Sequence, residues 1–182
     1  MSCHEFIQKY GSQMTQFERD EMSTFETVYY FNLNSKYKGV GTFVKNELTC
    51  QDENPEQQPP GGQFNHGFDN DQADYLYDAK DHINFRYEVQ KKLGRGAFGV
   101  VIRCYDHKTN ETVALKILKN WKKLHKQGKI EIRILETLRD SDRENSKNIV
   151  RIKDNFVFRS HVFIGFEMLS INLYQFIKNN DF

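Results

Sequence analysis

Three glycines at a fixed spacing, and one lysine further along the chain, are the residues best suited to chemistry. The glycines form a Gly-x-Gly-x-x-Gly run from Gly94 to Gly99, and Lys116 closes a Val-Ala-Leu-Lys run. Because glycine lacks a Cβ atom, it adopts conformations closed to other residues and lets backbone N–H groups approach phosphate oxygens. A lysine beneath such a loop reaches the same phosphates, so the pattern predicts a nucleotide site.

A glycine run of this spacing also opens dinucleotide-binding folds, where the glycines end a strand and begin a helix. Here the residues after Gly99 are Val, Val, Ile, Arg, Cys and Tyr, which favour a strand. A polar turn over 106–111 and a second apolar strand over Thr112–Leu118 follow. This order predicts an antiparallel meander with the glycines at its first bend, and it argues against a dinucleotide fold.

Strand alternation places Ala114 on the same face as Lys116. A side chain as small as that of Ala114 leaves room for a flat base beside the phosphates. The alternative is an ordinary surface lysine that follows a buried apolar run. The glycines upstream favour the nucleotide site.

The segment Lys122–Arg139 is the strong helix candidate after Lys116, because several of its apolar residues fall on one face. Glu131 interrupts that apolar stripe, as expected of a carboxylate turned inward toward a lysine. We therefore expect an ion pair between Lys116 and Glu131. The alternative is a surface glutamate that bonds a basic residue one turn away. Gly128 lies mid-helix, where glycine costs roughly 1 kcal/mol relative to alanine, and it predicts a weakly formed or weakly docked helix.

Two further strand-like runs, Ile149–Phe158 and His161–Phe166, precede the segment Phe166–Tyr174. That segment resembles the interlobe hinge of eukaryotic protein kinases, and the glycine and Val-Ala-Leu-Lys runs resemble the kinase glycine-rich loop and third strand. The resemblance implies an α+β fold. It would be the N-terminal lobe of a protein kinase, with a five-stranded antiparallel sheet and one helix, truncated before the helical C-lobe.

The resemblance implies in-line phosphoryl transfer from ATP with Mg²⁺ to protein hydroxyls. Lys116 would orient the α- and β-phosphates and Glu131 would hold Lys116, so these are the catalytic residues expected within the chain. The family's aspartate base and magnesium ligands belong to His-Arg-Asp and Asp-Phe-Gly segments, which do not occur up to Phe182. We therefore expect no metal ligand in these 182 residues, weak nucleotide affinity at best, and no measurable kinase activity from them alone.

The resemblance also implies which residues bind ATP. Phe166 would close the back of the adenine pocket, while the Glu167 carbonyl and the Leu169 N–H would bond the adenine edge. Asn172 would lie near the ribose, and apolar residues flanking the glycines would cover the ring. The expected set is Leu93, Gly94, Arg95, Gly96, Ala97, Phe98, Gly99, Val101, Ala114, Lys116, Phe166, Glu167, Met168, Leu169 and Asn172.

The resemblance narrows to the dual-specificity tyrosine-phosphorylation-regulated kinases (DYRK) of the CMGC group, and to their class 2. The runs Phe166–Tyr174 and Arg86–Val89 are similar to that family's core, and residues 5–36 and 67–87 resemble its N-terminal accessory region. In this family the accessory region supports a single autophosphorylation on tyrosine, after which the enzyme phosphorylates serine and threonine. The resemblance covers roughly residues 5–37 and 66–182.

These observations divide the chain into four parts. Residues 1–37 form an accessory segment, in which an apolar stripe predicts a helix and Val28–Phe31 predicts a short strand, both docked on the core. Residues 38–66 form a flexible polar linker loop, residues 67–86 a second accessory part, and residues 87–182 the kinase lobe, hinge and start of the next helix. The stripe comprises Phe6, Ile7, Tyr10, Met14 and Phe17.

Composition limits the classes of partner and compartment expected for the chain. The net charge is +1, and three cysteines lack any paired or metal-like spacing, which favours a reducing cytoplasmic or nuclear compartment. No apolar stretch is long enough for a signal peptide or a membrane span. A lysine cluster over 116–129 is read as a solvated helix face, which argues against nucleic acid. The expected partners are ATP and protein substrates bound through a C-lobe.

Two other functions stay open at this point. The chain could be a non-catalytic small-lobe module that holds ATP weakly or sequesters the partners of a kinase. An unrelated nucleotide-binding or nucleic-acid module is the third reading, and salt-dependent binding to DNA or RNA would favour it.

Overall fold

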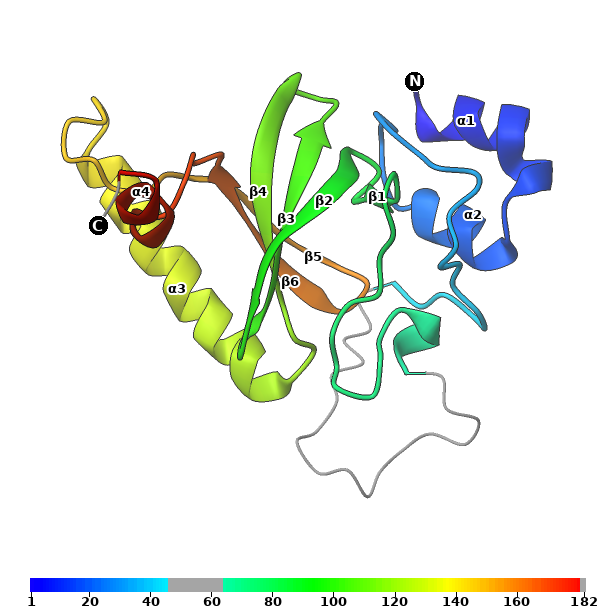
Figure 1. The fold of residues 1–182 in the computed structure, drawn as a ribbon. Helices are drawn as coiled ribbons and strands as arrows, with labels where there is room; N and C mark the ends of the chain where they lie inside the picture. Colours follow the sequence, from blue (N-terminus) through cyan, green and yellow to red (C-terminus); the bar gives the residue numbers. More distant parts are fainter. Residues whose placement is uncertain (46–63, 181–182) are drawn as a thin grey trace.

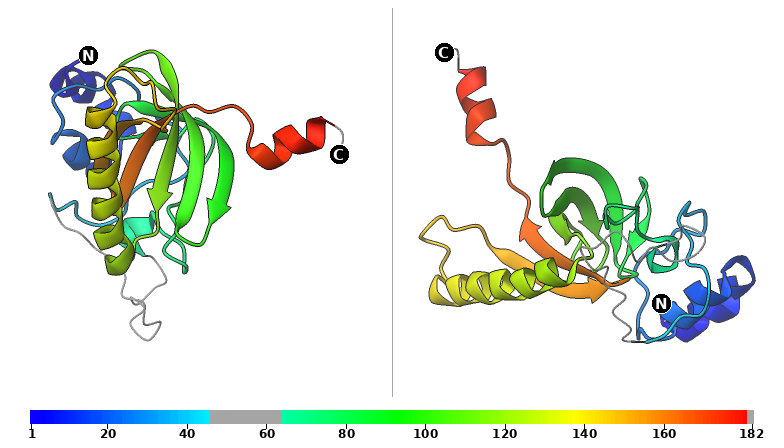
Figure 2. Two further views of the ribbon diagram at one scale, coloured as in Figure 1. Left: turned by 90° about the vertical axis from the view of Figure 1, so that its left-hand side faces the viewer. Right: turned by 90° about the horizontal axis from the view of Figure 1, so that it is seen from below.

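The computed structural model describes residues 1–45 and 64–180 (Figure 1). An antiparallel sheet lies at the centre, with helix α3 at one side and the N-terminal helices at the other, and helix α4 projects away from the body (Figure 2). The helices are α1 (Cys3–Tyr10), η1 (Gly11–Gln13), α2 (Gln16–Met22), η2 (Asn65–Gly67), α3 (Lys122–Ser141) and α4 (Leu173–Asn179). The strands are β1 (His82–Ile83), β2 (Tyr87–Gly96), β3 (Gly99–Asp106), β4 (Glu111–Leu118), β5 (Ile152–Phe158) and β6 (His161–Glu167).

The described sheet has six strands in the order β1-β2-β3-β4-β6-β5, with every neighbouring pair antiparallel. The predicted meander around the glycines is therefore confirmed. The five strands expected of the lobe are β2 to β6, and the second accessory part adds β1, which pairs through His82 and Ile83 alone. A strand of two residues has no alternation that a sequence pattern could reveal.

Each face of the sheet carries its own apolar core. One face, with Ile102, Leu115 and Phe163, packs against accessory residues such as Phe17 and Phe68. The other face packs against α3, which contributes Ile132 and Leu135 to a cluster containing Leu118, Val162 and Ile164. The predicted docking of the accessory segment on the core is confirmed, and its apolar surface is buried in the same cluster as that of the lobe.

The predicted helix over the N-terminal stripe is two helices. Helix α1 ends before a short 3₁₀ turn, and Thr15 then caps α2 by accepting from the Glu18 N–H while the Glu18 side chain accepts from the Thr15 N–H. This reciprocal cap starts a new helix. The apolar spacing misled because both helices turn their apolar sides to the same core.

The strand predicted at Val28–Phe31 does not form. Its N–H groups do not bond to one neighbouring strand. Val28 donates to the Met1 carbonyl, and both Tyr29 and Tyr30 donate to the Phe85 carbonyl. Two successive N–H groups that share one acceptor lack the alternating geometry of a ladder. The segment is held as an irregular connection between α2 and the lobe.

Most of the predicted linker loop, at residues 46–63, lies outside the described residues. Its described ends are packed against the accessory segment. The Val40 N–H donates to the His66 carbonyl, which joins the two ends to each other. The ring of Phe43 lies edge-on to that of Phe17 in α2, with centroids 5.4 Å apart. Aromatic pairs of this geometry add to the burial of both rings.

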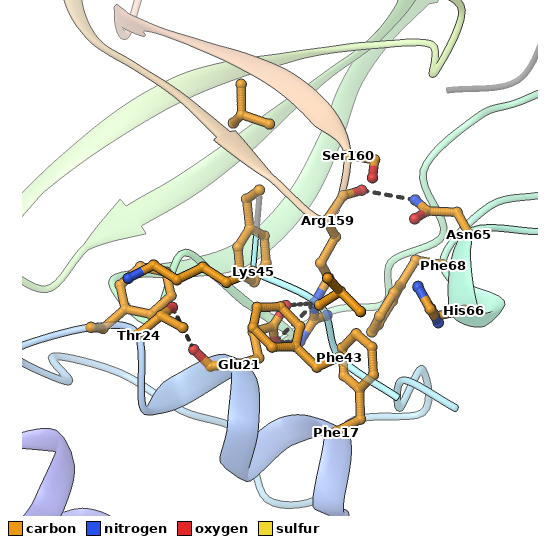
Figure 3. Close-up of a pocket in the computed structure, with 14 residues that line it drawn as sticks. Phe17, Glu21, Thr24, Phe43, Lys45, Asn65, His66, Phe68, Arg159 and Ser160 are labelled. Atoms are coloured by element: carbon orange, nitrogen blue, oxygen red, sulfur yellow. Dashed lines mark hydrogen bonds and ion pairs between the residues drawn. The ribbon is translucent and has the colours of Figure 1, made fainter. Parts of the chain in front are cut away.

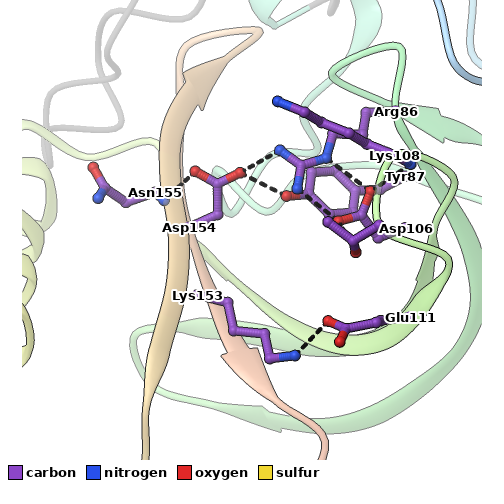
Figure 4. Close-up of polar contacts among 9 residues, drawn as sticks. Arg86, Tyr87, Asp106, Lys108, Glu111, Lys153, Asp154 and Asn155 are labelled. Atoms are coloured by element: carbon purple, nitrogen blue, oxygen red, sulfur yellow. Dashed lines mark hydrogen bonds and ion pairs between the residues drawn. The ribbon is translucent and has the colours of Figure 1, made fainter. Parts of the chain in front are cut away.

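The two sides of the curved sheet are tied together at the start of β2 (Figure 4). Asp154 on the edge strand β5 accepts from the Arg86 guanidinium and from the Tyr87 hydroxyl, each at 2.7 Å. Arg86 also forms two bonds to Asp106, at the end of β3. Burial, followed by the bond to Asp154, raises the pKa of the Tyr87 hydroxyl, which keeps it protonated as a donor.

Candidate functional site

Strand β4 and helix α3 bring Lys116 and Glu131 together. The Lys116 Nζ atom lies 2.6 Å from Glu131 Oε1, and the side chains are 25% and 32% exposed. The expected ion pair is therefore present, and it remains open to solvent on one side. Because α3 packs on the sheet face that contains Lys116, a carboxylate on its inner side meets the lysine directly.

The register of the sheet places several expected ATP-binding residues on that same face. Directly paired residues on neighbouring antiparallel strands point to the same side of a sheet. Val101 pairs with both Lys116 and Gly94, and Ala114 pairs with Phe166. Since Ala114 and Lys116 alternate together along β4, these five residues share one face.

The glycine lid, defined as residues Gly94–Gly99, corrects one expectation. A positive φ occurs at Gly99, whose φ is 150°, but not at Gly94 or Gly96. A Cβ atom at Gly99 would overlap the backbone carbonyl of Ile117, whereas a Cβ at Gly94 or Gly96 would meet nothing within 4 Å. The first two glycines thus leave open space, which suits the close approach of a phosphate, while Gly99 is required by the fold.

The remaining lid residues lie at the surface. Leu93 is 40% exposed and Phe98 is 53% exposed, and Ala97 lies in the exposed turn between β2 and β3. The Arg95 side chain is bonded to Asp74 in the second accessory part, at 2.5 Å. Arg95 is therefore turned toward the accessory region in this structure.

The predicted hinge residues follow the end of β6. Phe166 and Glu167 are half-buried, while Met168 and Leu169 are 37% and 59% exposed. The Glu167 carboxylate accepts from the Arg151 N–H, which ties the hinge to the start of β5. Asn172 caps helix α4 through a bond from the Gln175 N–H, so its carboxamide oxygen already has a partner.

Gly128, which the sequence marks as a weak point of the helix, has a packing role in the structure. It is buried inside α3, and a Cβ atom there would overlap the Leu118 side chain. Glycine at this position lets α3 lie close to β4 and to Val162 of β6. The helix propensity lost at Gly128 accompanies close packing of the helix that carries Glu131. The sequence signal for this packing is a mid-helix glycine that faces the apolar side of the helix.

The accessory segment is fixed to the lobe by a buried ion pair (Figure 3). Arg159, in the turn between β5 and β6, donates to the Glu21 carboxylate of α2 at 2.8–3.2 Å, and both side chains are at most 4% exposed. The Arg159 guanidinium also lies 3.9 Å from the centroid of the Phe68 ring and donates to the Tyr75 hydroxyl. Burial raises the pKa of Tyr75 to about 12, so its hydroxyl stays neutral.

The comparison with known proteins fits this arrangement. Residues 87–182 match the family model described as the protein kinase domain. The chain belongs to the protein kinase family. Its antiparallel sheet, with helix α3 packed on one face, is consistent with a kinase N-lobe.

Similar proteins place it near the DYRK kinases. This kinase chain is 42% identical over 173 residues to a dual specificity tyrosine-phosphorylation-regulated kinase 3 homolog of Drosophila melanogaster, covering 95% of the chain and 19% of that protein. It is 37% identical over 182 residues to human dual specificity tyrosine-phosphorylation-regulated kinase 4, covering 100% of the chain and 32% of the relative. For kinase 3 of Rattus norvegicus the identity is also 37%, with 28% of the relative covered. The chain is thus a DYRK-like kinase sequence that spans a third or less of these relatives.

Two further properties bear on the site. Among the helices of residues 1–45 and 64–180, none combines the length and the apolar character needed to cross a bilayer. The same residues contain no group of three or more His, Cys, Asp or Glu side chains arranged to hold a metal ion.

Proposed function

We propose that this chain is the ATP-binding portion of a protein serine/threonine kinase that autophosphorylates on tyrosine. The observation that carries the proposal is the Lys116–Glu131 pair, at 2.6 Å, on the sheet face that also presents Gly94, Val101 and Ala114. A cation held by a carboxylate beside an open glycine loop suits a polyphosphate.

The residues present fit ATP. Open space at Gly94 and Gly96 would admit phosphate oxygens close to the backbone. The small Ala114 side chain, beside Phe166, leaves room for the base. Bound ATP with Mg²⁺ supplies the γ-phosphoryl group that a kinase transfers to a protein hydroxyl.

Within this chain, the pair of Lys116 and Glu131 binds and orients the nucleotide phosphates. Glu131 holds the Lys116 ammonium in one position, and Lys116 offsets the negative charge of the α- and β-phosphates. None of the residues assigned here is a base for the accepting hydroxyl or a magnesium ligand. Those roles, and the reading of protein substrates, would belong to a C-lobe, so we propose that residues 1–182 alone turn over no ATP.

The test is to measure ATP binding by the purified chain with calorimetric titration. A hydrogen bond to a charged group contributes about 1.5–3 kcal/mol, so Lys116→Met should weaken binding about tenfold or more. Lys123→Met is the matched control, because Lys123 is an exposed lysine of α3 outside the site, and it should leave affinity unchanged. Equal affinities for the native chain and Lys116→Met would contradict the proposal.

A further inference from the structure

The accessory loop, defined as residues Asn70–Asp74, contacts the glycine lid directly. The Asp74 carboxylate lies 2.5 Å from the Arg95 guanidinium, and the Gln72 carboxamide oxygen accepts from the same nitrogen at 2.9 Å. Asp74 is 9% exposed as a residue, whereas the Arg95 side chain is 45% exposed. A nearly buried acceptor of the accessory region therefore holds an exposed residue of the lid.

The accessory loop is held by hydrogen bonds within itself and to the lobe. The Asn70 carboxamide oxygen accepts from the Gln72 and Asp74 N–H groups, each at 2.9 Å. Two residues that link β4 to α3 fix the loop to the lobe. Lys119 donates to the Gln72 carbonyl at 3.0 Å, and the Asn120 N–H donates to the Ala73 carbonyl at 2.9 Å. Arg95 is thus linked, through the accessory loop, to the connection between the strand of Lys116 and the helix of Glu131.

The contact holds the lid on the sheet face opposite to Lys116. Arg95 pairs with Val100, and Val100 pairs with Ile117, so Arg95 lies on the sheet face that packs against the accessory segment. Lys116 and Val101 lie on the opposite face. Asp74 and Gln72 therefore cannot touch a nucleotide bound beside Lys116, and any effect they have on it passes through Arg95.

We propose that Asp74 and Gln72 form a latch that holds the glycine lid through Arg95, which makes the accessory loop a positioning element of the nucleotide site. This inference rests on the proposed ATP-binding function. A lid that Asp74 and Gln72 already hold in place loses less conformational freedom when it orders over phosphates. The latch therefore raises nucleotide affinity. Asp74 and Gln72 are positioning residues, since neither reaches the ligand.

The experiment compares Asp74→Asn, Arg95→Gln and the double variant in the purified 182-residue chain. Arg95→Gln keeps the Asp74–Lys119 contact, so it opens the latch without disturbing the loop. We expect each single variant to weaken ATP binding about threefold, in line with a half-exposed ion pair, and the double variant to be no weaker than either. The matched control is Asp71→Asn, an exposed acid in the same loop, which should change nothing.

Hydrogen–deuterium exchange of residues 94–99, without nucleotide, gives a second readout that does not depend on ATP binding. Faster exchange in the lid of both single variants, but not of Asp71→Asn, supports the latch. Unchanged lid exchange overturns it, even if Arg95→Gln weakens binding, since Arg95 would then act on the phosphates directly. Additive losses in the double variant also overturn it. If the native chain binds no ATP, the proposed function fails, and the exchange rates alone decide the latch.

Discussion

At the scale of single residues, the glycines of the lid have different physical roles. Gly94 and Gly96 border open space and have ordinary backbone angles, so their value lies in what they leave room for. Gly99 has a φ of 150° and no room for a Cβ beside the Ile117 carbonyl. The three glycines look equivalent in the sequence pattern, and the contact with Ile117, which lies on the next strand, separates them.

Alanine substitutions should separate the two roles. Gly99→Ala places a side chain in a strained region and against a backbone oxygen, so we expect it to lower the free energy of unfolding by about 2–4 kcal/mol. Gly96→Ala should change stability by less than about 1 kcal/mol while weakening ATP binding. Urea denaturation and ATP titration of both variants are the measurements. Similar losses of stability in the two variants would contradict this distinction.

At the scale of elements, the strands around the lid and helix α3 could be predicted from sequence, because strand-favouring residues and an apolar helical stripe extend over many residues. The Lys116–Glu131 pair was predictable for the same reason, since one strand and one helix set its geometry. The two-residue strand β1 and the break between α1 and α2 gave no such periodic signal. The pair between Asp74 and Arg95 joins an irregular loop to the end of β2, and only the docked accessory loop brings the two residues together.

One buried charge pair contributes to the docking of α2, beside the burial of its apolar residues. Removing one partner of a buried pair leaves an uncompensated charge and costs about 3–5 kcal/mol. Arg159→Met should therefore lower the free energy of unfolding by about that amount, because Glu21 would remain buried at 4% exposure. Chemical denaturation measures the loss, and limited proteolysis should show earlier cleavage around α2.

The control for that prediction is a surface pair on the same sheet. Lys153 and Glu111 lie 2.5 Å apart, with side chains 36% and 52% exposed. Exposed pairs contribute about 0–1 kcal/mol, so Lys153→Gln should have little effect. If Lys153→Gln and Arg159→Met destabilised the protein equally, the anchoring role of Arg159 would be wrong.

At the scale of the whole molecule, the accessory segment and the lobe share one apolar core that contains residues from α2, the second accessory part and the sheet. A core shared by the accessory segment and the lobe favours unfolding of the two in one cooperative step. Of the three buried histidines in the described residues, His82 lies in β1 and His125 in the first turn of α3. Their protonation therefore acts on the stability of the entire described unit.

Acid should destabilise the protein through these histidines. Burial, with smaller effects of the nearby His161 and Lys129, lowers the pKa of His125 to about 4, and burial also lowers the pKa of His82. The folded state holds both rings neutral, while the unfolded chain takes up protons below about pH 6.5. The stability that the two neutral histidines contribute is therefore fully present above pH 6.5 and is lost as the pH falls toward 4.

Substitution isolates the contribution of His125 from that of the carboxylates, which also titrate in acid. Between pH 7.5 and 5.0, the shift of His125 corresponds to about 2 kcal/mol of lost stability. We expect the native chain to lose about that much more than His125→Gln over this interval, measured by urea denaturation at both pH values. His4→Gln, at an exposed histidine, should follow the native curve. Parallel losses in the native chain and His125→Gln would mean that the ring of His125 is protonated in the folded protein, and α3 would then be docked with a charge at its first turn.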